Sequence, residues 1–370
     1  MVAVNLVWLV PVLLLRMRGS IPAGLSVRLF GARPDTPLGT LGSLLSLGGF
    51  WRTDLAPPGR AALIWLPAFA LILCVAVFGW RRWTASWSAG ARRGLLVPAV
   101  VGLGLAVAPR VPGVDRAVVW VVRTLPGGGF LRDSQKFVIP LALGEAVAFG
   151  FGVEAVLQRI PTPDRLLRGI GVALALLPVA LAPTLAWGAG GRLHTTSYPR
   201  SWTMVERVTA GDRIDGGILV LPWHAYLPFG WNHDQTVHQP APFYFTRPVL
   251  SASRLEFGTN VLPGEDPWSR LADPVLLGGG ALAPHLRALG IRYVLLFKEG
   301  RWGPLVGRTA GLERVLDTPD LALYRGSYAG SVPSFPTPPT GPVLLADALA
   351  LGVVLTAGVA ALRARGRGSG

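Results

Sequence analysis

The sequence predicts an α-helical polytopic membrane protein with about six transmembrane helices and an extracytoplasmic α/β domain. Apolar residues make up 51% of the chain and charged residues only 15%, and the mean hydropathy is +0.46, unlike a soluble globular protein. Long apolar runs alternate with short loops that are rich in arginine. Only residues 192–340 mix basic and acidic residues evenly, over a length that is normal for one domain.

The chain begins with an apolar run at residues 2–15, which is short for a full span and lacks the basic start and cleavage site of a signal peptide. We expect such an abrupt start in the C-terminal part of a longer multi-pass protein. Residues 17–60 form a loop rich in Gly, Pro and Arg. Within it, the apolar patch at 38–51 is expected to lie on or dip into the membrane surface.

The remaining spans are apolar runs close to the ~20 residues that cross a bilayer. They cover residues 61–80, 94–109, 137–157, 169–191 and 342–362. Residues 110–129 are expected to form an interfacial helix before the third of these runs. The predicted organisation is therefore a membrane region at 1–191 with about five spans, the α/β domain at 192–340, a last transmembrane helix at 341–362 and a basic tail at 363–370.

Arginines set the expected orientation in the plasma membrane. The loop after residue 80 carries Arg81, Arg82, Arg92 and Arg93 and no acidic residue, so the positive-inside rule assigns it to the cytoplasm. The tail after residue 362 is basic as well. This orientation makes both termini cytoplasmic and residues 192–340 extracytoplasmic.

The net charge of +15 does not indicate a nucleic-acid-binding protein, because the arginines are scattered across loops between apolar segments. That distribution fits membrane topology and anionic lipid. The single cysteine, Cys74, lies inside an apolar run, so no disulfide framework is expected.

Short apolar runs predict the sheet of the α/β domain. Residues 217–221 (GILVL) and 291–297 (IRYVLLF) are typical of buried strands, and a helical segment at 282–289 precedes the second. Residues 321–325 (LALYR) alternate like a further strand. The strand, helix, strand order favours an α/β sheet.

A charged cluster runs into the apolar segment that ends at Leu157. Arg132 and Lys136 are four residues apart, so on a helix they would share one face and could hold a phosphate at headgroup level, with Asp133 orienting the pair. The alternative is that both are interfacial anchors. Further along, Glu145 lies about 12 Å into the span, where a carboxylate usually faces a cavity or a partner.

The loop at 221–234 (LPWHAYLPFGWNHD) follows a predicted strand and combines aromatic and polar side chains. Ligand-binding loops are common at strand ends, and aromatic faces with polar neighbours suit sugar rings. The candidate glycan-binding residues are Trp223, His224, Tyr226, Trp231 and Asp234. The alternative is that these aromatics dock on the membrane.

No metal or other cofactor is expected. A zinc site built from His224, His233 and His238 lacks helical spacing and a fourth clear ligand. No glycine-rich nucleotide loop or hydrolase motif occurs in a fitting context.

Several segments resemble a known family. NLVWLVP from Asn5, LGTLGSLLSLGGFW from Leu38, LRDSQKF from Leu131, LVLPWHAY from Leu219 and LRALGIRYVLL from Leu286 look like the C-terminal half of large actinobacterial membrane proteins, which resemble the C superfamily of glycosyltransferases. The resemblance implies transfer of sugars from polyprenyl-phosphate carriers to envelope glycans. It also implies a catalytic acid in the first outer loop of the whole protein.

This chain departs from that pattern, because Asp35 and Asp54, the acids of its first outer loop, do not form the expected acidic pair. The leading hypothesis is a glycosyltransferase-like protein, incomplete without an upstream N-terminal half or a partner membrane subunit. Its expected partners are membrane lipid, a polyprenyl-phosphate-linked sugar and an envelope glycan acceptor. The alternative is a non-catalytic membrane scaffold or a protein that handles lipid-linked glycans. A secondary transporter would need inverted repeats and broken helices, which the sequence does not suggest.

Overall fold

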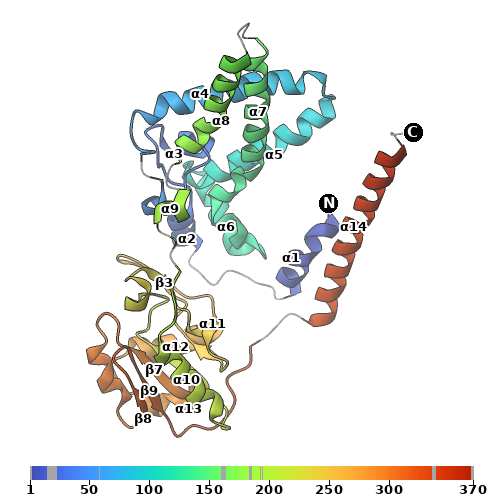
Figure 1. Ribbon diagram of the computed structural model, residues 1–370. Coiled ribbons are helices and arrows are strands. Elements are labelled where there is room, and N and C mark those ends of the chain that lie inside the picture. Colours follow the sequence, from blue (N-terminus) through green and yellow to red (C-terminus); the bar gives the residue numbers. More distant parts are fainter. Residues whose placement is uncertain are drawn as a thin grey trace. The chain divides into compact units, whose positions relative to one another are not determined.

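The computed structural model describes residues 2–14, 23–57, 59–159, 164–182, 186–191, 193, 195–335 and 339–367. The chain divides into two compact units. One unit is Ala23–His194, and the other combines Met1–Pro22 with Thr195–Gly370. Figure 1 shows the helices of the first unit and the sheet of the second.

The unit Ala23–His194 is helical. Its α-helices are α2 (Ala23–Phe30), α3 (Gly39–Leu45), α4 (Trp65–Trp83), α5 (Ala89–Val107), α6 (Val114–Thr124), α7 (Ile139–Leu157), α8 (Asp164–Ala180) and α9 (Ala186–Gly191). Short 3₁₀ turns include η3 (Ala108–Arg110), η4 (Gly128–Leu131) and η5 (Ser134–Val138). The segment labelled α9 has left-handed backbone angles from Trp187 to Gly190, so it is not a regular α-helix.

Four of the described helices are long and apolar enough to cross a membrane, which confirms a polytopic membrane protein. They are Trp65–Trp83, Ala89–Arg110, Ser134–Leu157 and Thr340–Ala360. The other two predicted spans fall on shorter helices, α1 (Val2–Leu14) and α8. Part of the predicted run at 169–191, residues 183–185, lies outside the described residues. The count of six spans and their orientation remain predictions.

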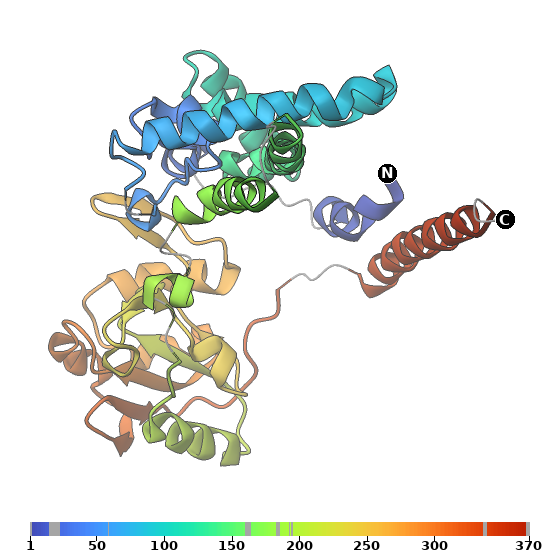
Figure 2. The same cartoon turned by 45° about the horizontal axis from the view of Figure 1, so that its top comes forward.

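Helices α4 and α7 pack through glycines, and Figure 2 shows them in one group with α5. A Cβ atom added to Gly79 would lie 1.9 Å from the carbonyl oxygen of Ala148, and one added to Gly152 would lie 2.0 Å from that of Val75. Small residues let helix backbones approach closely in a membrane, where hydrophobic burial gives little driving force between helices. These two glycines therefore set the α4–α7 distance.

The second unit contains a five-stranded sheet in the order β4-β1-β7-β9-β8. The strands are β4 (Val249–Leu250), β1 (Gly217–Leu221), β7 (Ile291–Phe297), β9 (Leu321–Arg325) and β8 (Glu313–Asp317). β4, β1 and β7 are parallel, whereas β9 pairs antiparallel with both β7 and β8. The strands predicted at 217–221, 291–297 and 321–325 are confirmed.

Both faces of this sheet are covered. One face packs on α10 (Arg200–Gly211), with Trp202 fully buried. The other packs on α12 (Pro267–Leu277) and α13 (Leu286–Leu289), with Trp268 in the core. This double cover explains why every residue of β1 and β7 is buried, as their continuous apolar runs indicated.

The remaining elements of this unit are small or terminal. Two hairpins, β2 (Tyr226–Pro228) with β3 (Thr236–His238) and β5 (Leu255–Phe257) with β6 (Asn260–Leu262), rise from the loops that follow β1 and β4. The short helix α11 (Ala241–Tyr244) follows β3. Helix α1 packs against α14 (Thr340–Arg367).

We expect Gly152→Ala to destabilise the protein, because the added methyl group would force α4 and α7 apart. Overpacking of this kind costs about 1–3 kcal/mol. The measurement is the thermal unfolding midpoint of detergent-solubilised protein. Gly150→Ala on the same helix is the matched control, since no atom lies within 4 Å of its added Cβ. Equal midpoints for the two variants would refute the close contact.

Candidate functional site

The charged cluster before α7 does not form one α-helix, so the expected shared helical face for Arg132 and Lys136 is wrong. Arg132 follows η4 as its C-terminal cap, and Lys136 lies in η5. Pro140 occupies the first turn of α7, where its fixed φ angle and missing N–H are tolerated. The α-helix therefore starts after the cluster, which stands in 3₁₀ turns.

Two side chains fix the backbone at this point. The hydroxyl of Ser134, fully buried, donates to the carbonyl oxygen of Ala106 (2.9 Å) and accepts from the amide of Ala32 (3.2 Å). The guanidinium of Arg110 donates to the carbonyl oxygens of Ala32 (2.5 Å) and Gly31 (3.0 Å). The loop after α2, the end of α5 and the start of α7 are thereby held together.

Aromatic rings position the two cations. The guanidinium carbon of Arg132 lies 4.5 Å from the centroid of the Phe30 ring, and its Nε lies 3.4 Å from Oδ2 of Asp133. The Nζ atom of Lys136 lies 4.0 Å from the Phe130 ring centroid and 5.7 Å from that of Phe137. Within the described residues, Lys136 has no hydrogen-bond acceptor and no carboxylate in ion-pair contact. Its ammonium donors are therefore open to an anion.

Glu145 is half-buried on α7, one residue after Gly144. The described part of the chain places no hydrogen-bond donor or cation in contact with its carboxylate. A functional role for Glu145 remains a prediction.

The loop after β1 alternates between two faces. From His224 to Gly230, even-numbered residues are exposed, whereas Ala225, Leu227 and Phe229 are buried. The exposed face is therefore formed by His224, Tyr226 and Pro228. It lies at the carboxyl end of β1, which pairs with β4 on one side and with β7 on the other, and open α/β sheets bind ligands where the strand order reverses in this way.

Two groups of side chains lie on this face. His224 Nδ1 is 2.8 Å from Oε2 of Glu256, whose Oε1 is 3.2 Å from Nε of Arg254. Tyr226 and His238 pair across the β2–β3 hairpin with ring centroids 5.3 Å apart, and His238 lies 6.2 Å from the Phe243 ring. Phe243 is 82% exposed. We call Tyr226, His238 and Phe243 the aromatic platform.

Two of the predicted glycan-binding residues, Trp223 and Trp231, pack into the core clusters, and Asp234 is exposed in the turn of the hairpin. Trp223 is buried and donates from Nε1 to Oδ1 of Asp273 (2.8 Å), so its ring belongs to the core and offers no face to a ligand. Trp231 packs on the other core cluster, with Phe229. Asp234 has a left-handed φ of 56° in the turn between β2 and β3. His224 and Tyr226 remain on the exposed face.

From the sequence, His238 was considered only as a zinc ligand, and Glu256 and Phe243 were not expected at this face. Glu256 comes from a hairpin after β4, 32 residues from its partner His224, so no local spacing could connect them. His238 could have been found from the alternation, since it lies opposite Tyr226 in the hairpin. Within the described residues, no group of three or more His, Cys, Asp or Glu side chains is arranged to hold a metal ion.

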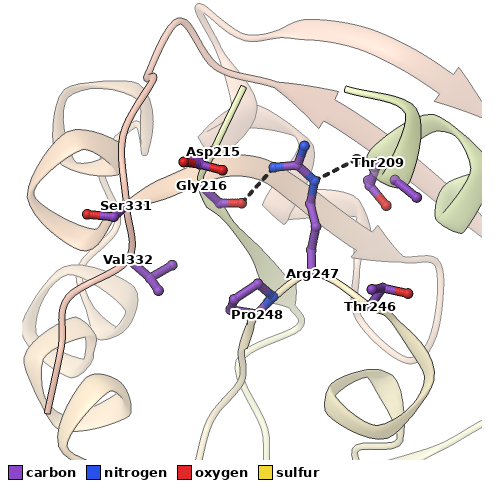
Figure 3. A pocket seen from close by; sticks show the side chains of 9 residues that line it. Thr209, Asp215, Gly216, Thr246, Arg247, Pro248, Ser331 and Val332 are labelled. Carbon is purple, nitrogen blue, oxygen red and sulfur yellow. Dashed lines mark hydrogen bonds between the residues drawn. The ribbon is translucent and has the colours of Figure 1, made fainter. Parts of the chain in front are cut away.

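A pocket of ≈ 420 Å³ lies at the amino-terminal edge of β1 and β4, lined by Thr209, Asp215, Arg247 and Ser331 among others (Figure 3). Arg247 spans it and donates to the carbonyl oxygens of Thr209 (2.6 Å), Ile214 (2.8 Å) and Gly216 (2.9 Å). It also donates to the carbonyl oxygen of Asp212. This arginine holds the α10–β1 connection and has little capacity left for a ligand.

Asp212 anchors the same connection. Its Oδ2 accepts from Tyr293 Oη (2.6 Å) and Arg292 Nε (3.1 Å), and its Oδ1 accepts from the amide of Ile214 (3.0 Å). Burial alone would raise the pKa of Asp212, but these hydrogen bonds and the charge of Arg292 outweigh it and lower the pKa to about 2. The carboxylate is therefore ionised over the whole physiological range.

No family model and no curated protein matches the sequence. The chain is similar to a single-particle cryo-EM structure of arabinofuranosyltransferase AftD from Mycobacteria, with 18% identity over 88% of this chain and 23% of that chain, at a TM-score of 0.47. A mutant of the same protein gives 19% identity, 88% and 24% coverage and a TM-score of 0.44.

The chain thus spans about a quarter of the length of these structures. An arabinofuranosyltransferase is a glycosyltransferase, and this class describes those structures. Both TM-scores are too low to establish a shared fold, and the likeness assigns no residue of the site.

We expect Asp212→Asn to destabilise the protein by about 2 kcal/mol at pH 6 but much less at pH 2. The folded-state pKa lies below the ordinary value of 3.8, so the stabilisation is present above pH 4 and is lost as the pH falls towards 2. The measurement is chemical unfolding of both proteins in detergent across pH 2–7. Asp215→Asn, at a neighbouring carboxylate, is the control. A stability difference that does not change with pH would contradict the assignment.

Proposed function

We propose that the chain is part of a membrane-embedded, glycosyltransferase-like protein that acts on polyprenyl-phosphate-linked sugars in cell-envelope glycan assembly. The resemblance of its sequence segments to the C superfamily of glycosyltransferases supports this class. The four long apolar helices place the chain in the membrane where such carriers reside. In the proposed orientation, the plasma membrane holds both termini on the cytoplasmic side and residues 192–340 outside.

The observation that carries the proposal is the state of Lys136. Its ammonium lies on the Phe130 ring just before an apolar helix, and among the residues that the structure describes its hydrogen-bond donors have no acceptor. A phosphate group at headgroup level offers the acceptors that these donors lack. Arg132, stacked on Phe30 and beside Asp133, contributes the second cation.

The exposed face of the α/β domain supports an acceptor-binding role. Sugars present apolar C–H faces and polar rims, which fit aromatic rings flanked by hydrogen-bonding groups. The aromatic platform supplies the rings, and His224 with Glu256 supplies the flanking polar groups. Docking of these exposed aromatics on a membrane surface is the competing interpretation.

A second function, binding of lipid-linked glycans without catalysis, is favoured by the state of the acids in the first loop. Asp35 is buried and accepts from Arg60 through both oxygens (3.1 and 3.2 Å) and from the amide of Gly49 (3.1 Å). Asp54 is paired with Arg52 at 2.6 Å. A general base needs a free carboxylate within reach of the acceptor hydroxyl. Neither acid is free, so a base would have to come from another part of the protein.

We expect Lys136→Met to weaken binding of polyprenyl phosphate by about ten- to a hundredfold, because one charge-assisted hydrogen bond to phosphate contributes roughly 1.5–3 kcal/mol. Methionine keeps the apolar stem on Phe130, so folding should be retained. The measurement is binding of polyprenyl phosphate to protein in nanodiscs. Arg123→Gln, an exposed arginine on α6, is the matched control. Unchanged binding by Lys136→Met would reduce the cluster to interfacial anchors.

We expect the double variant Tyr226→Ala, Phe243→Ala to lower affinity for an envelope oligosaccharide without changing the unfolding midpoint, because both side chains are exposed. The measurement is titration of the detergent-solubilised chain with oligosaccharide, monitored by tryptophan fluorescence. Unchanged oligosaccharide affinity in the double variant would contradict the acceptor-binding role and favour the membrane-docking interpretation. Transfer of radiolabelled sugar from its carrier, assayed in parallel, separates enzyme from handling protein.

A further inference from the structure

The far end of α7, opposite the Lys136 cluster, forms a second pocket with the end of α4. It has a volume of ≈ 310 Å³ and is lined by Arg82, Trp83, Trp87, Phe151, Glu154 and Gln158. This volume is at the lower limit of small-molecule sites, which span about 300–1,000 Å³. All of these residues belong to one compact unit.

Aromatic rings form the apolar side of the pocket. Trp83 stacks on Phe151, with ring centroids 5.2 Å apart and planes 16° apart. Trp87 meets the same indole edge to face at 4.4 Å. Tryptophans are enriched at membrane interfaces, where their rings sit at headgroup level. Here the rings contact one another and border a hollow, which is an arrangement that binds organic cations.

The polar side carries one negative and one positive group joined through an amide. Gln158 donates from Nε2 to Oε1 of Glu154 (3.1 Å) and accepts from Nη2 of Arg82 at 3.4 Å. Among the described residues, Oε2 of Glu154 has no donor. This long contact of 3.4 Å is the one hydrogen bond that the Arg82 guanidinium makes within the described residues, so most of its donors are open to a ligand.

Helix geometry adds to the preference for a cation near Glu154. Both α4 and α7 end here, and the last carbonyl groups of a helix carry partial negative charge. The pocket therefore presents an aromatic and anionic half beside a cationic half. A ligand that matches it must carry a cation and an anion a few bonds apart.

We propose that this pocket binds the headgroup of a zwitterionic phospholipid with a primary ammonium, namely phosphatidylethanolamine. The ammonium lies against Trp87 and donates to Glu154, and the phosphate accepts from Arg82. A solely anionic headgroup would be repelled by the carboxylate of Glu154. A quaternary ammonium could use the rings but could not donate a hydrogen bond to Glu154. The pocket is separate from the proposed carrier site at the start of α7.

The test is native mass spectrometry of the full chain in detergent, titrated with phosphatidylethanolamine, phosphatidylglycerol or phosphatidylcholine of the same acyl chains. We expect phosphatidylethanolamine to bind about tenfold more tightly than either of the others. Glu154→Gln should abolish that preference while phosphatidylglycerol binding is kept or improved. Arg82→Gln should weaken binding of all three lipids.

Controls separate the pocket from general membrane affinity. Arg93→Gln removes an exposed charge from the neighbouring helix α5 and should leave the lipid preference unchanged. Trp87→Leu should reduce the preference as Glu154→Gln does. If Trp87→Leu does not fold, Glu154→Gln decides alone, because that side chain is exposed. Equal affinities for the three lipids in the unmodified chain, or a preference that survives Glu154→Gln, would overturn the proposal.

Discussion

The helical unit depends on hydrogen bonds that pair backbone N–H and C=O groups at the N-terminal end of α7. In a bilayer, an unpaired N–H or C=O group costs several kcal/mol, so irregular backbone is tolerated only where protein groups pair it. Here the chain enters the span through 3₁₀ turns, and Ser134 and Arg110 pair backbone groups of the loop after α2 and of the end of α5. Phe30, at the end of that α2, is thereby held under Arg132. The position of the cationic cluster is a consequence of this backbone pairing.

The other end of the same helix is set by a different constraint. Gly79 and Gly152 allow the backbones of α4 and α7 to touch, and this contact brings Trp83 onto Phe151 and Arg82 towards Gln158. A larger residue at either glycine would separate the helices and open the aromatic wall. Close packing in the middle of the pair therefore builds the pocket at its end. The α/β unit is stabilised differently. Its sheet is held by buried apolar strands and by the hydrogen bonds among Asp212, Arg292 and Tyr293.

The sequence predicted the elements that a local residue pattern determines, and it failed for the contacts between residues far apart along the chain. Continuous apolar runs identified β1 and β7, and an alternating pattern identified β9, each at its observed bounds. The glycan-binding loop was assigned by composition, but Trp223 precedes the period-two alternation of residues 224–230 and is buried against Asp273. The helical face assumed for Arg132 and Lys136 failed because Pro140 starts the helix later. Glu256 joins the site through a separate hairpin, which no spacing in the sequence encodes.

Some charged side chains of the first unit are paired with other groups and some are not, and this difference limits which of them could take part in a reaction. Both carboxylate oxygens of Asp35 accept hydrogen bonds, from Arg60 and from the amide of Gly49, so this side chain holds the loop together. Lys136 has donors and no acceptor within the described residues, which suits a group that holds an anion. The unpaired ammonium of Lys136 and the paired carboxylates of Asp35 and Asp54 suit binding of a phosphate carrier better than proton transfer by this loop. Catalysis by the proposed protein therefore requires an acid or base from residues beyond the two carboxylates of this loop.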